Sequence, residues 1–277
     1  MWEYNYTDEL YHYGVKGMKW GVRKKYYKDY MDDDRIITKG SEFQNISANK
    51  ARDVNANNPV YASHTKHDNN AYAGRYADKI NFLNGEGSAI KNTLVTTKDI
   101  KVASQKKAVD TFMELYKSDP EGISTSIGKA YADLDYFHGI SRIRDWNANR
   151  ISKKFKSKGE DWIASKGYLL FNQSMTSEEN QARTKYYKLL SAKGYDAISD
   201  INDIQTGYNS DDPIIFINSK NSLHNKKSVS LTSDEIELAN ARYNYDEASK
   251  HKITHLDYYV DAKRYLKKVE KKQGLRK

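Results

Sequence analysis

The chain has 277 residues, a formal net charge of +9 from 46 basic and 37 acidic side chains, and a mean hydropathy of −0.91. It contains no cysteine, which excludes disulfides, thiolate catalysis and cysteine-based zinc sites. No apolar run approaches the ~20 residues that a membrane span requires, and the first residues do not resemble a signal peptide. We therefore expect one large domain, or a domain with extensions, and no membrane partner.

The first 34 residues are predicted to form a flexible docking arm. Within it, residues 11–25 read YHYGVKGMKWGVRKK, in which three glycines separate aromatic, apolar and basic side chains. Each glycine inside a helix costs roughly 0.5–1 kcal/mol relative to alanine, so a stable helix is disfavoured. The segment is either a docking peptide or a tail with chance aromatics. The residues expected to contact a partner are His12, Gly14, Lys16, Gly17, Met18, Trp20, Gly21 and Arg23.

The globular body is predicted to occupy residues 35–232. Its first part alternates short β-like runs with turn residues, and one stretch has helical period. We expect strands at 35–39, 42–47, 60–65, 89–95 and 99–103, and a helix at 66–78.

From Ser104, a suitable N-cap, the period becomes helical, and a helical insert is predicted over 104–157. A helix starting at Ser177 is expected to end with Gly194 at its C′ position. The remaining strands of the body are predicted at 169–172, 196–199, 213–217 and 228–231.

A C-terminal basic helical extension is predicted over 233–277. Thr232 and Glu235 form a capping box that opens a first helix. A second helix over 256–272 has a narrow apolar stripe, and residues 250–277 carry ten Lys or Arg against three acids. Because strands and helices are mixed without regular βαβ alternation, the fold class is predicted as α+β.

The string from His12 to Arg23 resembles an N-terminal signature of tailed-phage and prophage proteins. Its carriers are minor head proteins, protease or scaffold fusions and other virion-associated chains. The resemblance implies a location in the virion, and in the host cytoplasm before assembly or after injection. It also implies a capsid or portal protein as partner, with the segment acting as an assembly or packaging peptide.

The body contains a second set of parts in a suggestive order. Residues 42–47 and 60–63 are followed by a helix, and later by 193–198, a polar segment and 213–217. This order resembles phage-encoded ADP-ribosyltransferase-like domains, in which a pair of small, mainly antiparallel sheets surrounds a cleft that binds NAD. In that family a first-strand Arg or His and a second-strand Tyr or Ser hold the dinucleotide, and a late carboxylate, usually Glu, stabilises the cation that forms as nicotinamide leaves.

The resemblance places the NAD-binding positions at Tyr61 and Ser63 on the second strand and at Asn45 on the first. It places the catalytic carboxylates at Asp203 and Asp200. Two departures stand out: the first strand offers neutral side chains where the family has a cation, and the late carboxylates are Asp, one methylene shorter than Glu. For Tyr61 and Ser63 the alternative is an ordinary structural place in a strand.

Three functions follow as hypotheses. The first is a virion-associated minor structural protein with an ADP-ribosyltransferase-like body, and the second is an NAD-dependent ADP-ribosyltransferase that modifies a host protein. The third is a basic internal virion protein that binds DNA through its termini. No metal is predicted. The i, i+4 spacing of His251 and His255 could hold a metal, but a solvated helix face is the favoured alternative. The Asp-rich segment 200–212 is either a polar loop or a loose cation site, and it lacks the spacing of an EF-hand.

Overall fold

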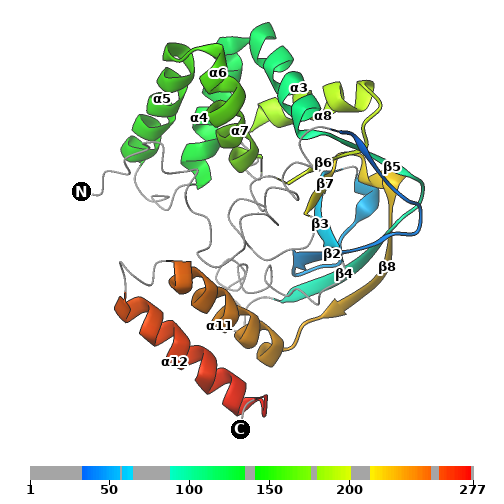
Figure 1. The fold of residues 1–277 in the computed structure, drawn as a ribbon, viewed down its shortest axis with the longest axis vertical. Helices are drawn as coiled ribbons and strands as arrows, with labels where there is room; N and C mark the ends of the chain where they lie inside the picture. The colour runs from blue at the N-terminus through cyan, green and yellow to red at the C-terminus, as the bar shows by residue number, and fades with distance from the viewer. Residues whose placement is uncertain are drawn as a thin grey trace.

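The computed structural model describes residues 33–56, 58–64, 88–134, 141–175, 180–200, 213–250 and 256–275. A curled sheet of eight strands is covered on one face by helices, which form the upper layer in Figure 1, and a helical hairpin lies at the bottom of that view. The predicted α+β class is confirmed. The arm up to residue 32 and the predicted helix at 66–78 lie outside the described residues.

The eight strands follow the order β1-β5-β6-β7-β3-β2-β4-β8 across the sheet. Neighbouring strands are antiparallel, except that β5 and β6 are parallel. Their bounds are β1 (Arg35–Ile37), β2 (Glu42–Ala48), β3 (Val60–His64), β4 (Ala89–Thr96), β5 (Ile100–Ala103), β6 (Ala197–Ser199), β7 (Ile214–Phe216) and β8 (Leu223–Ser230).

Strand β3 joins the two halves of this sheet. One of its edges pairs with β2, where Gln44 lies opposite Ser63, and its other edge pairs with β7, where Tyr61 lies opposite Ile215. The pair of sheets expected from the resemblance is therefore a single continuous sheet among the described strands.

The helices between β5 and β6 extend the predicted insert to residue 192. They are α3 (Gln105–Ser118), α4 (Pro120–Leu134), α5 (Ser141–Ser157), α6 (Glu160–Trp162), the π-helical turn η4 (Ile163–Gly167), α7 (Tyr168–Ser174) and α8 (Gln181–Ala192). Two short helical turns, η2 (Val54–Ala56) and α10 (Ser219–Ser222), lie outside the insert.

Local capping residues explain where several of these helices begin and end. The hydroxyl of Ser104 accepts a hydrogen bond from Lys107 N at 3.3 Å, which confirms the predicted N-cap of α3. Helix α8 begins after Asn180, whose side chain accepts from Arg183 N at 3.1 Å, and the expected start at Ser177 lies outside the described residues. Gly194 has φ of +82° and closes α8 as predicted.

The predicted strand at 169–172 is wrong, because these residues belong to helix α7. A short apolar run does not distinguish a strand from a buried helix. Here the run follows directly on helical turns, and Phe171 stacks on Phe112 of α3 with ring centroids 4.8 Å apart.

Two apolar clusters lie on opposite faces of the sheet. The cluster on the helix-covered face contains Phe112, Phe171 and Tyr186 from the helices together with Ile198 and Ile215 from the sheet. The cluster on the opposite face is built on side chains of the strands, chiefly Phe43, Leu94, Ile100 and Phe216.

The hairpin consists of α11 (Ser233–Lys250) and α12 (Leu256–Lys272). The predicted capping box is confirmed, since Thr232 N donates to Glu235 Oε2 at 2.7 Å and Glu235 N donates to Thr232 Oγ1 at 3.3 Å. Lys272 at the end of α12 pairs with Glu237 of α11 at 2.7 Å. No described helix is long and apolar enough to cross a membrane.

Asp34 attaches the start of the described chain to the body. Its carboxylate accepts hydrogen bonds from Ser104 N at 3.0 Å and from the Tyr195 hydroxyl at 2.8 Å, and Lys101 Nζ lies 3.8 Å away. Burial alone would raise the pKa of Asp34, but the hydrogen bonds from Ser104 and Tyr195 and the charge of Lys101 together lower it. These contacts hold the described chain against the body from Asp34 onward.

Candidate functional site

Three of the site residues predicted from the sequence, Tyr61, Ser63 and Asp200, lie near one edge of the sheet. Strands β3 and β6 run in the same direction, because each is antiparallel to β7. Ala62 and Ser199 both lie opposite Ile214, so the next residues, Ser63 and Asp200, lie at the same level, Ser63 within β3 and Asp200 just beyond the end of β6. Strand β2 starts at this edge, with Gln44 opposite Ser63.

Tyr61, Ser63 and Asp200 also share the helix-covered face. Tyr61 packs against the cluster on that face, and Ser63 follows it by two residues, the period of a strand. Ile198 lies in the same cluster and Asp200 is two residues beyond it. Consistent with this placement, the charge of Asp200 acts on Tyr168 and Tyr187 of the helical layer.

Two buried polar atoms at this edge have no hydrogen-bond partner in the described part of the chain. They are Ser63 Oγ and Gln44 Oε1, from residues directly opposite each other on β3 and β2. Ser63 is 1% exposed. Buried polar groups are usually paired, so these two atoms indicate a place where a ligand could supply the missing partners.

Asn45, the first-strand residue assigned from the resemblance, lies on the opposite face of the sheet. Its side chain donates to Tyr61 O at 2.7 Å and accepts from Arg52 Nε at 3.2 Å. The structure therefore separates the side chain of Asn45 from those of Tyr61 and Ser63. Gln44 stands beside Ser63 instead, and the alternation of side chains along a strand could have identified it.

Asn45 belongs to a structural network centred on Asn92, which is fully buried. Asn92 Nδ2 donates to Ser47 Oγ at 2.9 Å, and its Oδ1 accepts from Ser228 Oγ at 2.8 Å and from Arg52 N at 3.0 Å. Asn225 Nδ2 donates to Arg52 O at 3.0 Å. The network holds the chain after β2 against the sheet, and its satisfied hydrogen bonds explain the burial of its polar groups.

A group of buried tyrosines lies next to the edge. The Tyr168 and Tyr186 hydroxyls are 3.2 Å apart, and the Tyr186 hydroxyl donates to Ala108 O at 3.0 Å. Burial raises the pKa of Tyr168 to about 12, and burial with the neighbouring Tyr61 raises the pKa of Tyr187 well above its ordinary value. These phenols stay protonated at neutral pH, and Asp200 brings a carboxylate close to them.

The chemistry that this edge can support is that of a carboxylate among neutral hydrogen-bonding groups. A fixed carboxylate in a water-poor site stabilises a developing positive charge. The first strand supplies the neutral Gln44 at the position where the resemblance leads us to expect a cation.

The other predicted site residues, Asp203 and the eight residues of the arm between His12 and Arg23, lie outside the described residues. His251 and His255 do so as well. Among the residues that are described, no group of three potential ligands could hold a metal ion.

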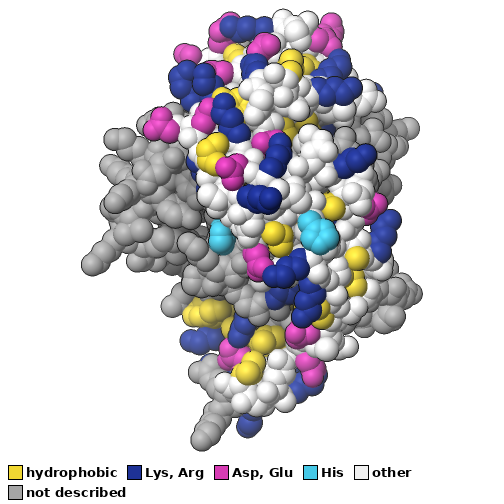
Figure 2. All heavy atoms as spheres, turned by 90° about the vertical axis from the view of Figure 1, so that its right-hand side faces the viewer, with side chains coloured by type: hydrophobic (Ala, Val, Ile, Leu, Met, Phe, Trp, Pro, Cys, Tyr) yellow, Lys and Arg dark blue, Asp and Glu magenta, His cyan; other side chains and the backbone are white. Residues whose placement is uncertain are grey.

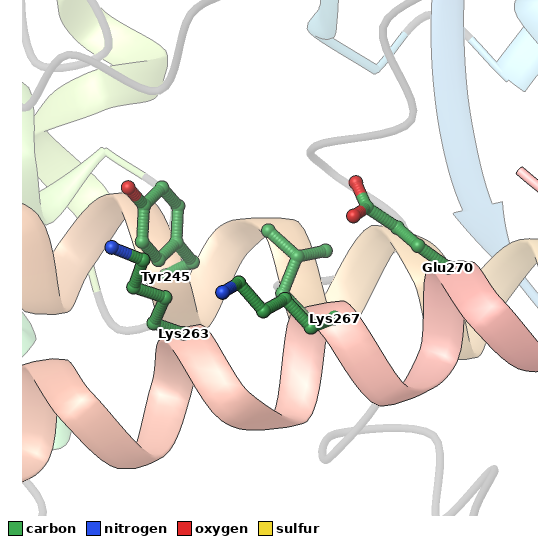
Figure 3. Close-up of a pocket in the computed structure, with 5 residues that line it drawn as sticks. Tyr245, Lys263, Lys267 and Glu270 are labelled. Atoms are coloured by element: carbon green, nitrogen blue, oxygen red, sulfur yellow. The ribbon is translucent and has the colours of Figure 1, made fainter. Parts of the chain in front are cut away.

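A shallow groove of about 310 Å³ lies between the two helices of the hairpin. Figure 3 shows Lys263, Lys267 and Glu270 of α12 and Tyr245 of α11 along it, and Leu266 completes the lining. The groove contains none of the residues predicted to form a site.

Basic and acidic side chains are interspersed on the molecular face that Figure 2 shows. Several cations of the described chain form ion pairs: Lys98 pairs with Asp196 at 2.6 Å, and Lys193 pairs with Glu114 at 2.5 Å. Because the positive charge of such paired lysines is neutralised by a neighbouring carboxylate, these lysines attract an anionic partner only weakly.

The profile of a family of unknown function, DUF7211, matches residues 4–26. No curated protein and no solved structure matches the chain.

Proposed function

We propose that this chain is a virion-associated minor structural protein of a tailed phage or prophage, which docks to the capsid or portal through its N-terminal segment. The observation that carries the proposal is the dense signature from His12 to Arg23. The family profile over residues 4–26 encloses this signature, which supports its being a unit shared among proteins. The profile ends ahead of Asp34, from which the described chain is held against the body.

In this proposal the glycines of the segment let the chain lie extended against its partner. Met18 and Trp20 are the apolar anchors, since large buried side chains supply most of the energy of an interface. Lys16 and Arg23 bind acidic groups at the rim, where they favour the correct orientation more than they add affinity.

The test is incorporation into particles. Phage that encode the Trp20→Ala variant are expected to contain little or none of the protein in purified particles, as judged by immunoblot, while the variant retains the circular dichroism of the parent. Tyr258→Ala, which removes a half-exposed aromatic side chain from α12, is the matched control and should be incorporated normally. Equal incorporation of the Trp20→Ala variant and the parent would refute the docking role.

For the body, we propose an ADP-ribosyltransferase-like domain that binds NAD at the edge formed by β3 and β6. The supporting observation is that Tyr61, Ser63 and Asp200 share one face and one edge of the sheet. The unpartnered atoms of Ser63 and Gln44 fit a ligand that both donates and accepts hydrogen bonds, as the carboxamide of nicotinamide does. NAD would supply the ADP-ribosyl group for transfer.

Transfer to a host protein is the alternative function of this domain. Asp200 and Asp203 would stabilise the cation that forms as nicotinamide leaves, and Tyr61 would orient the ring. The neutral side chain of Gln44 argues against transfer, because it brings no positive charge to the diphosphate of NAD. We therefore rank docking first and catalysis second.

Calorimetric titration with NAD, and transfer from labelled NAD to host lysate, separate the two functions of the domain. Binding that is lost in Ser63→Val but kept in Ser47→Ala would support the proposed site. Transfer that is also lost in Asp203→Asn would support the enzyme, whereas binding without transfer would leave a degenerate domain. Absence of both binding and transfer would refute the NAD proposal and leave the docking role standing.

A further inference from the structure

Helix α5 presents an exposed tryptophan in line with basic side chains. Trp146 is 62% exposed, and the guanidinium of Arg150 lies over its ring at 5.2 Å from the centroid. Lys153 continues the same stripe, since positions separated by four and then three residues share one face of a helix. Figure 1 shows α5 at the outer side of the helical layer.

The charge along this stripe has one sign. Residues 146–159 contain five Lys or Arg and no Asp or Glu. One of the five, Lys156, pairs with Glu121 of α4 at 2.5 Å. Arg150, Lys153 and Lys158 are exposed and form no ion pair with any described residue, in contrast to Lys98 and Lys193.

The crowding of these cations also acts on Lys154, the residue that follows Lys153 in α5. Burial lowers the pKa of Lys154, and the charges of Arg150, Lys158 and Lys166 lower it further. An anionic partner would relieve this repulsion on binding.

We propose that the exposed stripe of α5, formed by Trp146, Arg150 and Lys153 with Lys158 at its end, binds single-stranded nucleic acid. One base stacks on the ring of Trp146 and the cations contact the phosphates that follow. At a rise of about 1.5 Å per residue, Arg150 lies about 6 Å and Lys153 about 10 Å beyond Trp146 along the helix, so both cations can reach phosphates of one extended strand. This surface shares no residue with the docking segment from His12 to Arg23 or with the proposed NAD site.

The exposed ring favours this ligand over two other anions. An acidic peptide needs only the cations, and it would gain little from a large flat ring beside them. In a double helix the bases are already stacked, so no base is free to lie on Trp146. A single strand uses both the ring and the charges.

The experiment measures the fluorescence anisotropy of a labelled oligothymidylate titrated with the full chain at two salt concentrations. Stacking contributes about 1–3 kcal/mol per base, so Trp146→Ala is expected to weaken binding at least fivefold at both concentrations. Arg150→Gln combined with Lys153→Gln is expected to lower the slope of log affinity against log salt by about one to two. Because all three side chains are exposed, the variants should keep the thermal midpoint of the parent.

The matched control is Lys268→Gln combined with Lys271→Gln, which removes the same charge from the exposed face of α12. A loss of less than about twofold in this control supports the α5 site. The proposal is overturned if the control loses as much affinity as the α5 variant. It is also overturned if Trp146→Ala has no effect, if polyglutamate competes as well as the oligonucleotide, or if the parent does not bind at low salt.

Discussion

Ser63 and Gln44 lie directly opposite each other on β3 and β2, and neither the Ser63 hydroxyl nor the Gln44 carbonyl has a hydrogen-bond partner in the described structure. Strands normally place such a pair where the two side chains bond to each other, to water or to the backbone. The pair is therefore a local cost to stability that a bound ligand would offset.

We first predict that Ser63→Ala stabilises the protein. Removal of a buried hydroxyl without a partner should raise the free energy of unfolding by up to about 1 kcal/mol. Ser47→Ala is the control with the opposite sign, because the Ser47 hydroxyl donates to Lys50 O at 2.6 Å and accepts from Asn92. Ser47→Ala should lower the free energy of unfolding by about 1–2 kcal/mol. Urea unfolding measures both, and a loss of stability in Ser63→Ala would contradict the unpaired state.

A second prediction concerns Asn92. Asn92→Ala is expected to lower the free energy of unfolding by about 2–4 kcal/mol, because it leaves several buried partners unsatisfied. It also releases the backbone of Arg52, so limited trypsin digestion should cut after Arg52 faster than in the parent. Asn149→Ala, at an exposed position of α5, should change neither quantity. Unchanged cleavage after Arg52 in Asn92→Ala would show that the network does not hold this segment.

A third prediction concerns pH. The folded pKa of Asp34 is lower than its ordinary value of 3.8, so the unfolded chain binds its proton more tightly. The stability that Asp34 contributes is thus present above pH 3.8 and is lost as the pH falls through the lower folded value. Asp34→Asn should therefore be less stable than the parent at neutral pH, and the difference should shrink below pH 3.8 in a series of urea midpoints.

The same contact acts in the alkaline range with the opposite sign. Burial and the hydrogen bond to Asp34 raise the pKa of Tyr195 from 10.0 to about 12. This contribution is complete below pH 10 and is lost as the pH rises toward 12, where Tyr195→Phe should resist the loss better than the parent. If the difference in free energy of unfolding between Asp34→Asn and the parent stays constant with pH, the pKa shifts of both Asp34 and Tyr195 are contradicted.

A fourth prediction concerns the crossing of α4 and α5. A Cβ at Gly128 would lie 2.4 Å from the backbone carbonyl oxygen of Ala148, which cannot rotate away. Gly128→Ala should therefore destabilise the protein by about 1–3 kcal/mol, although alanine favours a helix. Gly159→Ala, where a Cβ meets nothing within 4 Å, is the control and should be neutral in thermal unfolding. Equal thermal midpoints for Gly128→Ala and Gly159→Ala would mean that α4 and α5 can move apart at this crossing without loss of stability.

Elements whose apolar pattern was clear could be predicted from the sequence. Strand β4 and helix α12 combine a regular period with clear ends, and both were located within about a residue. The full length of β8 was missed, because its outward side chains are mostly exposed and polar and only its last residues alternate. Helix α7 was mistaken for a strand because four apolar residues carry no period of their own.

The candidate site could be predicted only in part. The order of parts along the chain predicts Tyr61 and Ser63, and the structure places Asp200 at the same edge as these two residues. The resemblance assigns the first-strand position to Asn45, whereas the structure places its neighbour Gln44 opposite Ser63. A shift of one residue along a strand moves the side chain to the other face of the sheet. The contribution of β3 to both halves of the sheet depends on pairing between distant segments, which no local pattern encodes.

An open sheet with eight strands leaves two strands, β1 and β8, with an outer side that no other described strand covers. An exposed edge strand can pair with a strand of another chain and so begin aggregation. Here β1 is only three residues long, and β8 carries the exposed Lys226 and Lys227, whose charges would be forced together by the approach of another copy. The chain can thus reach high local concentrations without its own sheet becoming a template for polymerisation.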